Sequence, residues 1–297
     1  MTYNDGYKLK EWANHYSIYK ELLDVFVIVD NGSEDAYLKE LRETFPEAVL
    51  IERKSNGGCT AAYNDGIKYV LNNTDIEAIV IIANDMKLSK GCLMAMYEYL
   101  FSKEDLGIVS SAILYKDSDI IDNYGHCVHG ITVSYCNRGE HITDIKVKQK
   151  YTDLVSGGFT MAKRQFYVRA GLQDEALFMY CDELDTMLKA KKSGFKIGVI
   201  GNEYAWHWHI NQPATSKRSS ASRYLISRNR VYVTRKNNMR LGLIKSIFIG
   251  MVKSPIAFLL RFFKEKDKEY LNDAKYSFIG VIHGLTGRMY TNQYTRF

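Results

Sequence analysis

The chain has 297 residues, of which 46% are apolar and 25% are charged, a balance typical of a folded globular protein. Only 3 Pro and the lack of low-complexity tracts exclude long disordered linkers. The 5 Cys are odd in number and form no C-x-x-C pair, which argues against a disulfide framework or a zinc site and favours a reducing compartment.

The charge is distributed unevenly along the chain. Residues 211–297 contain 17 Lys and Arg against 4 Asp and Glu, a net charge of +13, whereas the first 210 residues carry −7. This asymmetry indicates an anionic partner for the C-terminal region, either nucleic acid or an anionic membrane surface. The chain start has no basic region followed by an apolar stretch, so we expect no secretory signal.

The first 114 residues alternate helical patterns with short apolar runs. Such alternation predicts an α/β fold whose sheet is mostly parallel and covered by helices on both faces. The expected helices lie near 9–23, 35–45, 60–71 and 90–102, and the expected strands near 25–29, 48–52, 79–82 and 107–114.

Residues 115–155 interrupt this alternation with short polar stretches and glycines, which predicts an antiparallel insertion. A strand near 155–162, a helix near 164–170, a helix near 177–192 and a strand near 195–200 follow. We expect a loop to begin at Trp206-His207-Trp208-His209.

The chain becomes basic and helical after Ser219. Leu241–Phe263 is apolar, but Lys245, Lys253, Pro255 and Arg261 interrupt it. A membrane-spanning helix needs about 20 mostly apolar residues, so we expect an amphipathic helix at the membrane surface, with an ordinary packing helix as the alternative. The predicted domains are therefore 1–210 and a helical extension, 211–297.

The apolar run Ile79–Ile82 reads as a buried strand, and it is followed by Asn84-Asp85. Ligands of open α/β sheets bind beyond the carboxyl ends of the strands. A carboxylate there can hold a divalent cation against a diphosphate, because hard cations take oxygen ligands. The alternative is that Asn84-Asp85 simply starts a turn.

Four blocks in this order resemble the inverting glycosyltransferases of family 2, which have the GT-A fold. Within that family the chain is similar to the rhamnosyltransferase-like enzymes of bacterial surface polysaccharides, over nearly all of residues 2–236. The blocks are Val29–Ser33, Asn56–Gly58 with Asn64–Gly66, Ala83–Asp85, and Gly171–Glu175 with Phe178 and Asp182–Asp185.

The resemblance implies a nucleotide-sugar site in which Asp30 accepts a hydrogen bond from the base. A helix-capping Asp and a plain glycine turn are the alternatives for Asp30 and for Asn56-Gly57. Arg228 would reach the diphosphate, unless it is one more basic residue of the C-terminal region. The full expected nucleotide-sugar set is Tyr3, Asp30, Asn31, Asn56, Gly57, Asn84 and Arg228.

The resemblance also implies a Mg²⁺ or Mn²⁺ ion held by Asp85, which neutralises charge on the leaving diphosphate. Ala83 departs from the family, because a polar or acidic residue usually opens this triplet. The family often supplies a histidine to the metal after the last strand, which points to His207 or His209.

Glu183 stands where the family has its catalytic Asp, and Asp182 stands where a Glu usually precedes it. An inverting transfer needs a base for the acceptor hydroxyl, and the resemblance implies Glu183, with Asp182 as the other candidate. A solvated acidic cluster at a helix start is the alternative. Gly157 and Gly158 would line the acceptor side.

A second departure lies at the start of the chain. Tyr3-Asn4 matches the turn that follows the first strand of the family, but no strand precedes it. We therefore expect an exposed sheet edge and an incomplete base pocket.

Taken together, these features predict an inverting glycosyltransferase that moves a sugar from a nucleotide diphosphate to a lipid-linked or polysaccharide acceptor in cell-surface glycan synthesis. It would be cytoplasmic and peripheral on the inner face of the cell membrane, with no nucleic-acid partner. The alternative is a catalytically degenerate GT-A module that binds sugar nucleotide or glycan as a partner subunit. The donor, acceptor and linkage do not follow from the sequence, because fold alone does not set specificity.

Overall fold

The computed structural model describes residues 1–208 and 220–289, which form two compact units. Unit 1 comprises Met1–Cys127, Ser134–Glu175 and the described part of Thr186–Ala214. Unit 2 comprises Val128–Val133, Ala176–Asp185 and the described part of Thr215–Phe297. Two segments that precede residue 210 thus belong with the C-terminal helices, which the predicted domain boundary did not include.

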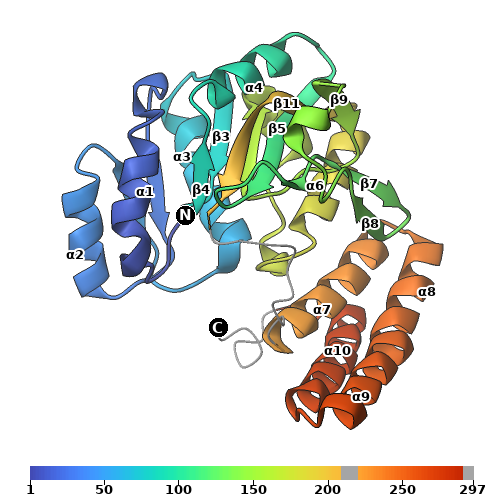
Figure 1. The fold of residues 1–297 in the computed structure, drawn as a ribbon. Helices are drawn as coiled ribbons and strands as arrows, with labels where there is room; N and C mark the ends of the chain where they lie inside the picture. Colours follow the sequence, from blue (N-terminus) through green and yellow to red (C-terminus); the bar gives the residue numbers. More distant parts are fainter. Residues whose placement is uncertain (209–219, 290–297) are drawn as a thin grey trace. The chain divides into compact units, whose positions relative to one another are not determined.

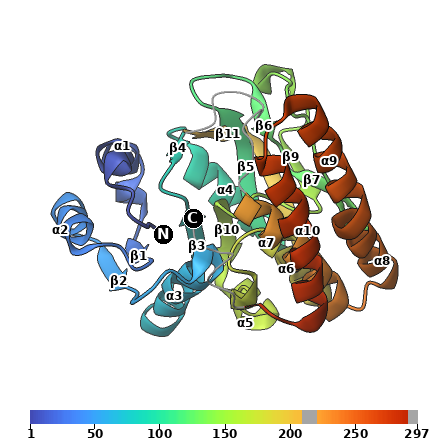
Figure 2. The ribbon, with the colours of Figure 1, turned by 90° about the horizontal axis from the view of Figure 1, so that it is seen from below.

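Unit 1 is an α/β unit whose elements mostly lie within a few residues of the predicted ranges (Figures 1 and 2). Its strands are β1 Val27–Asp30, β2 Val49–Glu52, β3 Ala78–Ile82, β4 Met86–Leu88, β5 Leu106–Tyr115, β6 Ile121–Asn123, β9 Gln149–Thr152, β10 Phe159–Lys163 and β11 Lys196–His207. Its helices are α1 Leu9–Tyr16, α2 Asp35–Thr44, α3 Gly58–Asn73, α4 Cys92–Phe101 and α5 Arg164–Ala170. The hairpin β7 His126–His129 and β8 Thr132–Tyr135 belongs to the predicted insertion.

The larger sheet of the described residues has seven strands in the order β3-β10-β5-β11-β4, with β6 paired to β5 and β9 paired to β11. Strands β3, β5 and β11 share one direction, because β10 is antiparallel to both β3 and β5 while β11 is parallel to β5. The sheet is therefore mixed rather than mostly parallel, although the predicted α/β class is confirmed. All ten residues of β5 are buried, as expected for a strand in the middle of a covered sheet.

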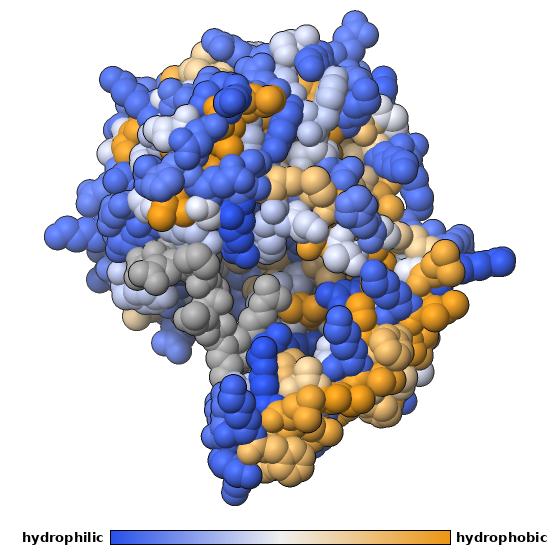
Figure 3. Space-filling model, turned by 45° about the vertical axis from the view of Figure 1, so that its right-hand side comes forward, coloured by the Kyte–Doolittle hydropathy of each residue, from blue (hydrophilic) through white to orange (hydrophobic). Residues whose placement is uncertain are grey.

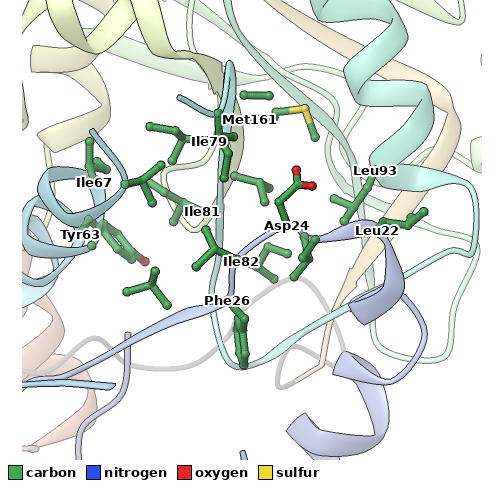
Figure 4. Close-up of a pocket in the computed structure, with 18 of the residues that line it drawn as sticks. Leu22, Asp24, Phe26, Tyr63, Ile67, Ile79, Ile81, Ile82, Leu93 and Met161 are labelled. Carbon is green, nitrogen blue, oxygen red and sulfur yellow. The ribbon is translucent and has the colours of Figure 1, made fainter. Parts of the chain in front are cut away.

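Strands β1 and β2 form a separate parallel sheet, so the sheet of unit 1 is broken between β1 and β3. A cavity of about 430 Å³ lies at the break, lined by residues of β1, β3, α3 and α4. Figure 4 shows apolar side chains around it, among them Ile79, Ile81 and Phe26. Ahead of β1, only Thr2 pairs with Asp30 as a parallel bridge. The break leaves β3 at the edge of the larger sheet.

The described part of unit 2 is mainly a set of helices: α7 Ser220–Lys236, α8 Arg240–Phe248, a π-helical turn Ile249–Lys253, α9 Ser254–Glu265 and α10 Glu269–Thr286. Helices α7 and α10 lie side by side (Figure 2) because Gly280 and Gly284 let their backbones approach. A Cβ atom at either glycine would lie 2.5 Å from a carbonyl oxygen, that of Tyr224 or of Arg228. The sequence of α10 therefore encodes a close helix contact.

Within the described ranges, one continuous helix, Arg240–Glu265, is long and apolar enough to cross a membrane by length and composition. The expectation that Leu241–Phe263 fails this test is therefore wrong. The basic residues are spread so widely that an 18-residue window with at most two charges remains. Pro255 lies in the first turn of α9, directly after the π-helical turn, where its missing N–H does not break the helix.

Candidate functional site

The carboxylate of Asp30 organises the loop at the end of β1. Asp30 is 0% exposed and accepts hydrogen bonds from the backbone N–H groups of Gly32 and Ser33, at 3.0 and 2.9 Å, and from the Ser33 hydroxyl. Gly32 has φ +88°, and a Cβ there would lie 2.8 Å from the backbone of Ser55. Only glycine fits this close approach. In this conformation Asp30 holds the loop, and a contact with a nucleotide base stays a prediction.

Asn31 joins this loop to the glycine turn after β2. Its amide nitrogen donates to Asn56 Oδ1 at 3.0 Å and to the carbonyl of Gly58 at 3.1 Å, while its own oxygen accepts from Gly57 N–H at 3.0 Å. Asn31 is 1% exposed, so these bonds are made inside the protein. The structure thus brings together Asp30, Asn31, Asn56 and Gly57, and Tyr3 follows Thr2, which is bonded to the same loop.

The loop after β3 carries Asn84 and lies against the predicted acceptor-side glycines. Asn84 donates its side-chain amide to Asp5 at 2.9 Å, which links it to the segment that begins at Tyr3. The backbone N–H of Ala83 donates to the carbonyl of Gly158 at 2.7 Å. A Cβ on Gly158 would lie 3.5 Å from Ala83 Cβ, so this glycine packs directly on the predicted metal loop. Gly157 is its chain neighbour.

Asp85 and His207 meet because β11 is longer than the sequence predicts. The strand runs through Trp206 to His207 instead of ending at Ile200, and its end pairs with β4, so that His207 lies opposite Met86. His207 Nε2 is 3.4 Å from Asp85 Oδ2. Burial lowers the pKa of His207, but the hydrogen bond and the charge of Asp85 outweigh burial, and the net pKa lies above 6.5. The expectation that a loop begins at Trp206 is wrong.

This pair can supply two ligands to a divalent cation. No group of three or more His, Cys, Asp or Glu side chains placed to hold a metal occurs within residues 1–208 and 220–289. One carboxylate oxygen and one imidazole nitrogen suit Mn²⁺, and phosphate oxygens and water can complete its coordination. The donor set therefore fits a cation that binds together with a diphosphate. His209 lies outside the described residues.

The acidic pair Asp182-Glu183 opens α6, Asp182–Lys192, after an unusual loop in unit 2. Phe178, Tyr180 and Cys181 all have positive φ, between 61 and 69°. Left-handed backbone is costly for residues other than glycine and persists only where neighbours enforce it. Contacts from other residues of unit 2 must therefore hold this loop in its left-handed conformation.

Asn229 and Arg228 of α7 hold the loop through its carbonyl groups. The Asn229 amide donates to the carbonyls of Leu177, Met179 and Tyr180, each at 2.8 Å. Arg228 is 0% exposed, and its guanidinium donates to the carbonyls of Ala176 and Leu177 at 3.1 and 3.0 Å, to the carbonyl of Met289 and to Asn229 Oδ1. These contacts give Arg228 a structural task, and its predicted contact with a diphosphate stays a prediction.

The two acidic side chains have different surroundings. Asp182 is 5% exposed, and burial together with the charge of Glu183 raises the pKa of Asp182 well above its ordinary value. Glu183 is only half-buried. Of the pair, Glu183 is therefore the side chain that solvent and ligands can reach. Both belong to unit 2, whereas Asp85 and His207 belong to unit 1, and their convergence stays a prediction.

Three residues that contribute to these arrangements had no predicted role. Asp5 holds Asn84 and pairs with Lys8 at 3.3 Å. Asn64 donates to the carbonyl of Gln173 and to the carboxylate of Glu175, at 2.9 and 3.0 Å, which joins two of the family-like blocks. Asn229 of α7 donates to three carbonyls of the loop before Asp182. Each of the three is a small polar residue inside a family-like block or close in sequence to a predicted site residue, and a buried amide or carboxylate needs hydrogen-bond partners.

Comparison with known proteins agrees with this geometry. Residues 13–169, more than half of the chain, match the sequence profile of glycosyl transferase family 2. The low-salt glycan biosynthesis hexosyltransferase Agl10 of Haloferax volcanii is 25% identical over 269 residues, which cover 89% of this chain and 83% of Agl10.

Two solved structures share the fold. The mannosyltransferase PcManGT of Pyrobaculum calidifontis, in complex with GDP-Man and Mn²⁺, has a TM-score of 0.54 and 16% identity, over 97% of this chain and 86% of PcManGT. GalNAc-T7 with UDP, GalNAc and Mn²⁺ has a TM-score of 0.56 and 14% identity, over 91% of this chain. This chain covers only 52% of GalNAc-T7. At these identities the likeness concerns the fold alone, and it confirms the predicted GT-A fold.

Proposed function

This chain belongs to glycosyl transferase family 2, and we propose that it is an inverting enzyme that moves a hexosyl group from a nucleotide diphosphate to a lipid-linked or polysaccharide acceptor in cell-surface glycan synthesis. The family and the hexosyltransferase relative support a glycosyltransferase that acts on nucleotide sugars. The observation that carries the proposal of metal-assisted transfer is the Asp85–His207 pair, 3.4 Å apart where β4 begins and β11 ends.

The donor would bind where the loops after β1, β2 and β3 come together. Asn31 and Asn56 tie two of these loops, and Asp5 with Asn84 ties the third. Backbone groups around Gly57 would approach the nucleotide closely, because glycine leaves the space free. A divalent cation bound by Asp85 and His207 would neutralise charge on the diphosphate as it leaves. PcManGT and GalNAc-T7 were both solved with Mn²⁺, which supports this choice of ion.

The proposed transfer is a single displacement at C1 of the sugar. The acceptor oxygen forms a bond to C1 while the bond from C1 to the diphosphate oxygen breaks, and the configuration at C1 inverts. Glu183 takes the proton of the acceptor hydroxyl, since it is accessible. Asp182 keeps its proton more readily, because burial and Glu183 raise its pKa, and so it would donate a hydrogen bond to Glu183.

The acceptor would approach past Gly157 and Gly158, the expected acceptor-side glycines, of which Gly158 packs against Ala83 of the metal loop. The basic C-terminal region would keep the enzyme on the inner, anionic face of the cell membrane. A lipid-linked acceptor lies at that surface, and the name of Agl10, a glycan biosynthesis hexosyltransferase, supports a role in glycan synthesis.

Transfer assays on a panel of nucleotide sugars test the proposal. Asp85→Asn and Glu183→Gln are each expected to lower turnover by about 100-fold or more, because a metal ligand and a general base are lost. Asp119→Asn, at an exposed carboxylate, is the matched control and is expected to act like the wild type. Normal turnover by Asp85→Asn would reject the metal role, and normal turnover by Glu183→Gln would reject the base.

A binding-only module is the second candidate, and two observations favour it: Ala83 in the metal triplet and the break in the sheet. It predicts that nucleotide sugars raise the melting temperature while no free nucleotide and no glycoside form. Release of nucleotide that depends on Asp85 decides against it.

A further inference from the structure

One face of the helix Arg240–Glu265 carries a stripe of exposed apolar side chains. Apart from one adjacent pair, they are spaced by three or four residues, which places them on one side of a helix of about 39 Å. Figure 3 shows an apolar band over the C-terminal helices. The members of this stripe are Leu241, Ile244, Phe248, Val252, Ile256, Leu259, Leu260 and Phe263, which are 39–84% exposed.

The opposite face of the same helix is fixed to α10. A Cβ on Gly250 would lie 2.3 Å from Val281, and Ser277 donates its hydroxyl to the carbonyl of Gly250 at 3.1 Å. Phe258 packs on Tyr270 and Ala274. This face is buried inside unit 2, so the stripe is the only large apolar part of the helix that faces outward in the described residues.

These contacts decide between crossing a membrane and lying on it. A helix that crosses must be apolar towards lipid on every side that its own bundle does not cover. Helix α10 is bound to this helix, and α10 packs in turn on α7, which carries Arg223, Arg228, Arg230, Arg235 and Lys236. A spanning orientation would carry these charges into the hydrocarbon or break the contacts of α10, and both are costly. The geometry therefore favours a helix that lies in the plane of the surface.

The charged side chains near the stripe indicate which kind of membrane surface the helix would bind. Residues 240–268 contain seven Lys and Arg against two Asp and Glu. Lys253, Arg261 and Lys264 are exposed. Long basic side chains keep their charge in the headgroup layer while their stems lie along apolar surface. An apolar stripe with basic flanks matches an anionic bilayer better than an uncharged one.

We propose that the helix Arg240–Glu265 inserts its apolar stripe, in plane, into one leaflet of an anionic membrane. This inference rests on the proposed membrane location and names the element that produces it. It is independent of the chemistry of transfer, because no member of the stripe belongs to the candidate site.

Flotation of the full chain with vesicles tests the proposal. The wild type is expected to float with vesicles rich in phosphatidylglycerol and to float weakly with phosphatidylcholine alone. Phe248→Ser/Leu260→Ser is expected to lose about tenfold or more of this binding, since both side chains are over half exposed and their loss leaves the core intact. The matched control, Tyr7→Ser/Val168→Ser, alters exposed apolar residues of unit 1 and is expected to bind normally.

The outcomes distinguish the proposed membrane location from the proposed role of the apolar stripe. No binding by the wild type would overturn the membrane location itself. Binding by the wild type and equally by the Phe248/Leu260 variant would leave the location and reject the stripe.

Depth measurements separate an in-plane helix from a spanning one. Tryptophan is introduced in turn as Leu241→Trp, Val252→Trp and Phe263→Trp, and quenching by brominated lipids is compared with the parent protein. Equal, shallow depths at all three positions are expected for the in-plane helix. A deep Val252 position between two shallow ends would show a spanning helix and overturn the proposal.

Discussion

At the scale of single residues, Asn229 is a fully buried side chain whose loss should affect both stability and turnover. Its amide nitrogen holds three carbonyls of the loop that precedes Asp182-Glu183. We expect Asn229→Ala to lower the free energy of unfolding by about 1–3 kcal/mol, because buried carbonyls lose their donor. Turnover should fall more than the Michaelis constant changes, since the acidic pair loses its position while the nucleotide loops of unit 1 are untouched.

Urea unfolding and steady-state kinetics measure both effects. Asn272→Ala, at an exposed position of α10, is the control and should leave both unchanged. Equal stability and equal turnover of the Asn229 variant would show that the loop holds its left-handed residues without this side chain.

Buried histidine gives a second prediction at this scale. His126 is 4% exposed, and burial lowers its pKa below the ordinary 6.5, although the carbonyl of Leu154 accepts a hydrogen bond from its ring. The unfolded chain therefore binds a proton more readily than the folded protein does. His126 contributes fully to the free energy of unfolding at pH values above its pKa in the unfolded chain. This contribution is lost as the pH falls through its pKa in the folded protein.

The free energy of unfolding should accordingly decrease when the pH is lowered from 7 to 5. His126→Gln is expected to flatten part of this decrease, whereas the exposed His129→Gln should not. Chemical unfolding of the three proteins across this pH range makes the comparison. Parallel curves for wild type and His126→Gln would assign the pH dependence to other groups.

At the scale of elements, the sequence predicts short-range order better than long-range pairing. The apolar run at Ile79–Ile82 ends where β3 ends, so the place of Asp85 at a strand end follows from the residues alone. The polar stretch Asn202-Glu203 hides the continuation of β11, which depends on pairing with β4 and β5, and so His207 reads as a loop residue. Long-range strand pairing of this kind leaves no local pattern.

Arg228 shows the same limit for a charged side chain. A basic residue in a basic region reads as exposed, yet its partners are carbonyls about 50 residues earlier in the chain and one near its end. The spacing of apolar residues indicates which face of a helix is apolar, but it does not indicate which distant carbonyl groups lack hydrogen-bond donors. The role of Arg228 therefore appears only with the tertiary structure.

At the scale of the whole molecule, the break between β1 and β3 dominates the architecture of unit 1. The two sheets face each other across a cavity of about 430 Å³, where Ile79, Ile81 and Val27 present apolar side chains without a strand between them. An edge strand with free backbone groups accepts a further strand. Thr2 already bonds to Val29 and Asn31 in parallel register, so a strand joined ahead of Met1 would run directly into this gap.

Fusing an apolar strand of about four residues, the length of β1, ahead of Met1 is expected to raise the melting temperature. Each kcal/mol gained corresponds to about 2–4 °C for a protein of this size. Backbone amides of β1 and β3 should exchange more slowly, because they gain hydrogen-bond partners. The same extension carrying two prolines is the control, since proline cannot complete the ladder. If both extensions leave melting and exchange unchanged, the gap does not take a strand, and the separation of β1 from β3 is a stable feature of the fold.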